Sequence, residues 1–523
     1  MDMIKKFGFA THGETLRLLY DAFGLLPRKV AGADEFDEKD KKTLQKQLSR
    51  LASEEGNLVE NYSKAIEAFQ HLLIKYLPAP RHADALAIVL DELNLNYAEM
   101  IRTEGSHLCK LDSLRYFISV RAIPTLILSI NRTMLLWDPE EGSGLQSDDL
   151  FWYLPTRESD GRLTMPLAKV MRWTYQVSGV SQKQFHCPGK FSDPVDPALQ
   201  QNLENAINWT RGKTLPSLLA LVRNFETSFA VQSRYERSVD LDIQKSILTA
   251  LVYARVGTFI AREIEQAFGS AYLDDVCLQI RELAAFLQEE VLEFKAEITP
   301  IMHAKPTADD AQWVWIKACV HHDSFVKNKI SQVWRTLGEL YAASPSEPFK
   351  PEVLNALVRK YGKFSVYLNT DRWGRQAEFS MHNVFRELLD IGFQLKKKSD
   401  MTWEEISEFE ARVIKEGQQE TLSWFAPWLR GIYHYRKEDY ATAFLFYEIA
   451  FEQGKYRAGS LQYDLVNQFI EIAAKNDKEV PFKKGIEWAS YIGVPIRWLR
   501  EKERTEENLK FVRYVMKRAS YAH

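Results

Sequence analysis

Cysteine is scarce in this sequence, and neither sign of charge is in excess. The four cysteines, Cys109, Cys187, Cys277 and Cys319, lie far apart and form no CxxC pair. This spacing argues against a disulfide framework and against a zinc site built from thiolates. With 68 basic and 71 acidic residues the formal net charge is -3, so no overall positive field attracts nucleic acid or anionic lipid. The net charge does not exclude a local basic patch.

Long apolar runs and phosphate-binding loops are also missing. The nearest approach to a membrane helix, residues 122–130, is shorter than the roughly 18 apolar residues that a span needs. No apolar run follows the first lysines, so we expect no secretory signal, no membrane partner and a cytoplasmic location. No glycine-rich phosphate loop, nucleophile elbow or HExxH helix occurs. The sequence therefore predicts no cofactor.

A 3.6-residue apolar period dominates what is present. Apolar side chains recur every three or four positions between residues 242 and 268, and again between Val276 and Phe294. Such spacing gathers them on one face of a helix. Gly269 lies between the two segments and predicts a break between two helices of a hairpin. Because strict alternation is rare, the sequence predicts an all-α fold.

Stretches rich in proline, glycine and aspartate separate the helical segments. They lie at residues 138–149, 187–197, 299–310 and 343–351, where proline removes backbone donors and disfavours helix in the residue before it. The chain is also longer than one hydrophobic core usually spans. We therefore expect three units: an N-terminal helical unit (1–137), a middle helical unit (138–310) and a C-terminal helical array (311–523).

Small and aromatic residues recur at fixed spacing in the C-terminal unit. The first set is Trp334, Leu337, Gly338 and Tyr341, which reproduces the W-x2-L-G-x2-Y pattern of the first helix of a tetratricopeptide repeat. The second set places Gly431 at the small first-helix position and Ala443, Tyr447 and Ala450 at second-helix positions. A third set, Phe482, Gly485 and Trp488, repeats the spacing of Tyr440, Ala443 and Phe446. This unit thus resembles tetratricopeptide-type helical hairpins.

That resemblance implies protein–protein contact, because stacked hairpins form an extended binding surface. We expect a non-enzymatic scaffold or adaptor that acts within a regulatory complex, and we leave its oligomeric state open. The residues expected to contact a protein partner are Tyr433, Tyr435, Tyr447 and Trp488. The alternative is a generic array of helical hairpins, in which small residues only let helices cross closely.

Another pattern consists of Trp209, Gly212, Pro216 and Leu221 at intervals of three, four and five residues, with Ser217 as a candidate N-cap. We expect Gly212 to end one helix in the left-handed conformation and Pro216 to open the next. Residues 207–225 thereby resemble the end of the recognition helix and the next helix of repressor-type helix-turn-helix domains. Residues 180–185 resemble the start of the preceding helix, although the proline-rich 187–197 segment intervenes. The resemblance implies a nucleic-acid-binding regulator. Its contacts would come from Asn208, Arg211, Lys213 and Arg223.

Two further patterns are compatible with a catalytic function. Arg102 with His107, and Arg375 with His382, have the spacing of the Arg-His pairs in HEPN-type helical ribonucleases. In that class the histidine acts as general acid or base and the arginine stabilises phosphate charge. His321, His322 and Asp323 form a run similar to the dispersed ligands of helical metal phosphohydrolases. Adjacency alone does not give convergent ligands, so we predict no metal site there.

Overall fold

The structure is a computed structural model. It describes mainly residues 10–25, 46–77, 81–103, 117–128, 151–187, 197–235, 238–322, 376–499 and 505–518, apart from residues 55 and 124. In these parts the only strands are β1 (Thr156–Arg157) and β2 (Leu163–Thr164), a short antiparallel pair. The prediction of an all-α fold is confirmed. Of the helices in these ranges, none combines the length and apolar character that a membrane span requires.

The N-terminal helices are α1 (His12–Phe23), α3 (Leu58–Tyr76) and α4 (Arg81–Thr103), with a π-helical turn, η1 (Phe117–Ala122), packed on α4. A capping box between Thr11 and Glu14 starts α1, because each side chain satisfies a backbone N–H of the first turn. Gly24 ends the helix in the left-handed region. Tyr20 and Phe69 meet edge to face in the core beneath.

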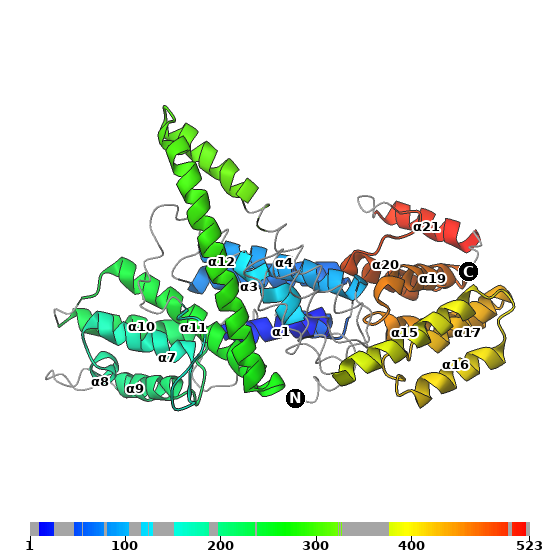
Figure 1. The fold of residues 1–523 in the computed structure, drawn as a ribbon, viewed down its shortest axis with the longest axis horizontal. Helices are drawn as coiled ribbons and strands as arrows, with labels where there is room; N and C mark the ends of the chain where they lie inside the picture. Colours follow the sequence, from blue (N-terminus) through cyan, green and yellow to red (C-terminus); the bar gives the residue numbers. More distant parts are fainter. Residues whose placement is uncertain are drawn as a thin grey trace.

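The middle of the chain forms a bundle around its own core. Its helices are α7 (Pro166–Ser178), α8 (Gln182–His186), α9 (Pro197–Thr210), α10 (Leu218–Ser233) and α11 (Leu241–Phe268). The predicted break at Gly269 is confirmed: this residue has a φ of 88° and separates α11 from α12 (Ser270–His303), and the two helices pack on each other. In Figure 1 the bundle lies at one end of the molecule.

The far end of α12 projects from the rest of the described chain together with the helix at 308–322 (Figure 1). Trp315 and Cys319 are buried there against Phe294, Ile298 and neighbouring apolar side chains of α12. Trp313 and Val320, on the same helix, are exposed. The hairpin therefore has a small core of its own.

The C-terminal helices pack in sequence order. They are α15 (Gln376–Lys397), α16 (Trp403–Lys415), α17 (Phe425–Arg436), α18 (Tyr440–Gly454), the 3-10 turn η4 (Gly459–Leu461), α19 (Gln462–Lys475), α20 (Glu479–Ile492) and α21 (Glu506–Arg518). Gly431 faces the ring of Tyr447, and Gly485 faces Ile470. The Trp334–Tyr341 motif lies outside the described residues.

The N-terminal helices lie against this array, with α3 and α4 packed on α20 (Figure 1). The rings of Tyr62 and Tyr491 meet edge to face at 6.3 Å. Arg102 donates a hydrogen bond to the carbonyl of Gly493 at 3.1 Å. The largest core accordingly joins residues of α4, α12 and the array in one cluster. Segments about 400 residues apart in sequence thus fold against each other.

Candidate functional site

A half-buried aromatic cluster lies where α16, α17 and α18 meet. Trp403 contacts the rings of Tyr433, His434 and Phe446 at 5.8, 5.8 and 5.9 Å. The rings of His434 and Phe446 are stacked at 5.5 Å. All four side chains are only partly buried. The local sequence determines where Trp403 lies, because Thr402 and Glu405 form a capping box that starts α16 at this residue.

Charged groups surround the cluster. The guanidinium of Arg430 lies over the Trp403 ring at 5.1 Å and pairs with Glu410, and the ammonium of Lys437 lies over the Tyr433 ring at 4.1 Å. Such cation–π contacts hold aromatic rings at a surface in fixed orientations. His434 Nδ1 is 3.1 Å from a carboxylate oxygen of Asp439. The rings are therefore held in place on a polar rim.

The outward face of α18 continues this surface. Ala443 and Tyr447 are fully buried on its inner face, whereas Leu445 is 58% and Ile449 43% exposed on its outer face. A helix that is apolar on all sides is expected to be covered on all sides. We call the set Trp403, Tyr433, His434, Leu445, Phe446 and Ile449 the α18 surface.

The structure assigns different surroundings to the four aromatic residues expected to contact a partner. Tyr433 belongs to the α18 surface, but Tyr435, Tyr447 and Trp488 are buried. The Tyr435 hydroxyl donates to Glu471, and the Tyr447 hydroxyl donates to Gln468 at 3.3 Å. In this fold these three rings pack the core.

Trp403, His434 and Phe446 were not among the residues that the sequence led us to expect at a partner interface. The available signal was the run from Tyr440 to Phe451, which contains a single charged residue, Glu448, and so has no polar face. A helix of that composition indicates either complete burial or an exposed apolar surface.

Residues 207–225 form the end of α9, a turn and the first half of α10. Gly212 ends α9 in the left-handed conformation, and the Ser217 side chain caps α10 by accepting from the N–H of Ala220. Trp209 and Leu221 are buried in the core of the bundle. The short α8 packs against both α9 and α10. The predicted left-handed stop and cap are confirmed.

The four residues expected to contact nucleic acid lie near this turn. Arg211, Lys213 and Arg223 are exposed, and Asn208 is half-buried on α9. Residues 166–235 contain eight Lys or Arg and four Asp or Glu. The segment 166–235 is thus locally basic within a chain whose formal net charge is -3.

A fully buried histidine lies between α7, α8 and α10. Ser228 Oγ donates a hydrogen bond to the carbonyl of Asn224 at 2.8 Å, so this hydroxyl is left to accept one from His186 Nδ1–H, which lies 3.1 Å away. The other ring nitrogen, Nε2, accepts a hydrogen bond from the Tyr175 hydroxyl, also at 3.1 Å. Burial lowers the pKa of His186 to about 3. The neutral imidazole is satisfied on both nitrogens and has a structural role.

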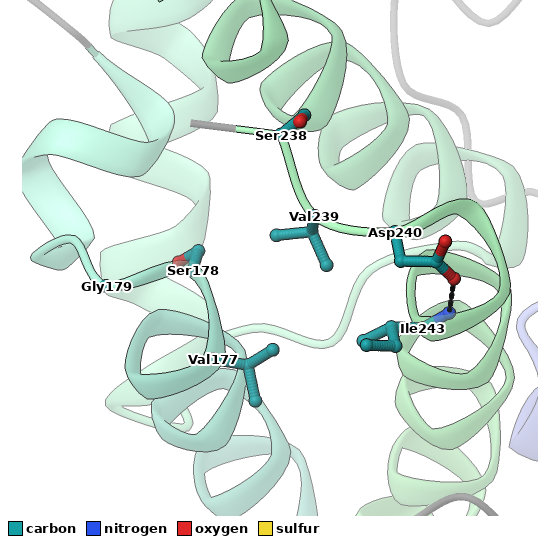
Figure 2. Close-up of a pocket in the computed structure, with 7 residues that line it drawn as sticks. All are labelled: Val177, Ser178, Gly179, Ser238, Val239, Asp240 and Ile243. Atoms are coloured by element: carbon teal, nitrogen blue, oxygen red, sulfur yellow. Dashed lines mark hydrogen bonds between the residues drawn. The ribbon is translucent and has the colours of Figure 1, made fainter. Parts of the chain in front are cut away.

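An open hollow of about 520 Å³ lies between the end of α7 and the start of α11, and Figure 2 shows the residues around it. It is lined by Val177, Ser178, Gly179, Ser238, Val239, Asp240 and Ile243. The carboxylate of Asp240 is the N-cap of α11 and accepts from the N–H groups of Asp242 and Ile243. The negative charge of Asp240 therefore stabilises the N-terminus of α11.

The residues considered for catalysis and metal binding are only partly described. Arg102 contacts Gly493, while His107, Arg375, Asp323 and the side chain of His382 lie outside the described residues. His321 is exposed, and the ring of His322 stacks on Phe294 at 4.4 Å. In the described ranges no three His, Cys, Asp or Glu side chains come together as metal ligands.

The described cysteines are free thiols, and two of them are buried. Burial raises the pKa of Cys277 and of Cys319 to about 11, which keeps both protonated and unreactive near neutral pH.

No protein-family model matches the chain, and comparisons with curated proteins and with solved structures gave no similar protein.

Proposed function

We propose that this protein is a helical adaptor that binds a partner protein through the α18 surface. The observation that carries the proposal is the exposure of Leu445 and Ile449 beside a fixed aromatic cluster. Folding alone gives no reason for apolar side chains at these positions, because the opposite face of α18 already packs the core. Aromatic anchors next to exposed aliphatic side chains are typical of binding hot spots.

The same proposal interprets α17–α20 as two stacked hairpins of the tetratricopeptide type. In support, the small residues Gly431 and Gly485 lie directly against side chains of the neighbouring helix, Tyr447 and Ile470 respectively. Arrays of this kind present the outer faces of successive helices side by side, and binding surfaces form across them. The α18 surface spans three successive helices in this way.

The test is affinity capture from the native host with the full chain and with Leu445→Asp/Ile449→Asp. Both side chains are exposed, so the variant should fold, and circular dichroism checks this. A matched control, Ile88→Asp/Leu95→Asp, changes two exposed apolar residues of α4. We expect one protein to be captured by wild type and control, lost with the α18 variant, and to bind again when purified. Equal capture by all three chains would refute the proposal.

As a second candidate, we propose that the α8–α10 segment binds nucleic acid. The observation that favours it is the exposure of Arg211, Lys213 and Arg223 around one turn in a locally basic segment. Exposed cations at such a turn can contact phosphates, while an amide such as that of Asn208 can read a base edge.

Binding to labelled duplex DNA and to RNA, measured over a range of salt concentrations, tests this candidate. Neutralising phosphates releases counterions, so affinity should fall steeply with salt and should drop in Arg211→Glu/Lys213→Glu. The control is Arg172→Glu, an exposed charge on α7. Binding that is unchanged in the turn variant would reject this assignment.

A further inference from the structure

The α18 surface carries acidic groups that have no ionic partner among the described residues. Glu404 follows Trp403 at the start of α16, Glu438 lies in the turn before α18, and Glu448 lies between Leu445 and Ile449. Residues 401–454 contain ten Asp or Glu and five Lys or Arg. Two cations of α17 and the turn after it are already engaged, since Arg430 pairs with Glu410 and Lys437 lies over Tyr433.

The apolar part of this surface extends along α18 towards α20. Lys484 pairs with Glu452 at 2.5 Å, and Lys478 lies over the ring of Phe444 at 5.8 Å. These two contacts require α18 and α20 to run in the same direction. Val480, in the first turn of α20, is 78% exposed. Leu445 and Ile449 lie one turn apart on the outer face of α18 and form an apolar strip, and Glu448 lies between them in the sequence.

We infer that the partner element that binds the α18 surface is a basic amphipathic helix. This inference rests on the proposed function. An amphipathic helix presents apolar side chains every three or four residues and can follow an elongated strip. Its Lys and Arg residues would meet the unpaired carboxylates of Glu404, Glu438 and Glu448. An acidic helix would place like charges together, which disfavours binding.

The test uses the full chain and two synthetic helices with the same leucine face. One peptide carries lysine at all other positions and the second carries glutamate. At low salt the lysine peptide should bind about tenfold more tightly, and added salt should reduce the difference. Glu438→Lys/Glu448→Lys should weaken binding of the lysine peptide and strengthen binding of the glutamate peptide. Equal affinities for both peptides, or no response to the charge reversal, would overturn the inference.

Leu445→Ser/Ile449→Ser, which removes the apolar side chains without adding charge, separates this inference from the proposal on which it rests. If wild type binds both peptides alike and this variant binds neither, the α18 surface is a docking site but its preference for basic helices is wrong. If the variant binds the lysine peptide as wild type does, the peptide docks elsewhere and both are wrong. Ile88→Ser/Leu95→Ser, at exposed positions of α4, serves as the control, and it should bind like wild type.

Discussion

The ammonium of Lys455, at the end of α18, forms an ion pair with the carboxylate of Glu54, next to the N-terminal helix at 46–52. The two side chains are only 10% and 11% exposed. Burial lowers the pKa of Lys455, but Glu54 and Glu452 raise it further, and the net shift is upward. The ammonium thus stays charged, and this pair is one of the contacts between the N-terminal part of the chain and the array.

Replacing Lys455 with methionine should destabilise the protein by about 3–5 kcal/mol, because the carboxylate of Glu54 would be left buried and unpaired. Urea unfolding followed by circular dichroism measures the loss. The control is Lys483→Met, which breaks an exposed pair with Glu479 and should cost less than about 1 kcal/mol. Similar losses in the two variants would contradict a buried role for Lys455.

Arg255 joins α11 to two other helices. Its guanidinium donates to the carbonyls of Asp21 and Ala22 at the end of α1, and to that of Pro216 just before α10. Arg255→Met should cost about 3 kcal/mol, because buried carbonyls would lose a charged donor. Hydrogen exchange should show faster opening of α1 in particular. Arg172→Met, at an exposed position of α7, should leave α1 protection unchanged.

His186 makes stability depend on pH. The unfolded histidine has an ordinary pKa of 6.5, and the folded one has a pKa of about 3. Between these values the unfolded state binds more protons, so the free energy of unfolding falls as pH falls, by up to about 1.4 kcal/mol per pH unit. The contribution is complete above pH 6.5 and is lost progressively down to about pH 3.

Urea midpoints of wild type and His186→Gln at several pH values between 7 and 4 test this. We expect the variant to be less stable at neutral pH but to lose less stability on acidification, because glutamine does not titrate. Parallel pH profiles for the two proteins would show that His186 does not take up a proton on unfolding.

Local features of the fold could be predicted from the sequence. The left-handed stop at Gly212, the cap at Ser217 and the break at Gly269 depend on backbone conformation and on hydrogen bonds within a few residues. The ion pair of Glu54 and Lys455 could not be predicted, because its partners come from opposite ends of the chain and no periodic pattern relates them.

The candidate site was predictable only in part, for a similar reason. The aromatic residues predicted to contact a partner include residues of α17 and α18, which both contribute to the α18 surface. Periodicity, however, does not predict which face of each helix is covered by the neighbouring helices. The ring of Tyr447 faces Gly431 in the core, whereas the ring of Phe446, the preceding residue, contacts the ring of Trp403 in the aromatic cluster. A shift of one position on α18 turns a side chain by about 100° and changes a core residue into a surface one.

Gly431 tests the packing of α17 on α18. A Cβ at this position would lie 2.8 Å from a ring carbon of Tyr447, so Gly431→Ala should overpack the crossing and cost about 1–3 kcal/mol despite the better helix propensity of alanine. Tyr447→Leu alone should also destabilise, because it leaves a cavity. In the double variant the smaller side chain makes room for the new methyl group. Its loss in unfolding free energy should therefore be smaller than the sum of the two single losses, and strictly additive losses would show that Gly431 and Tyr447 do not pack together.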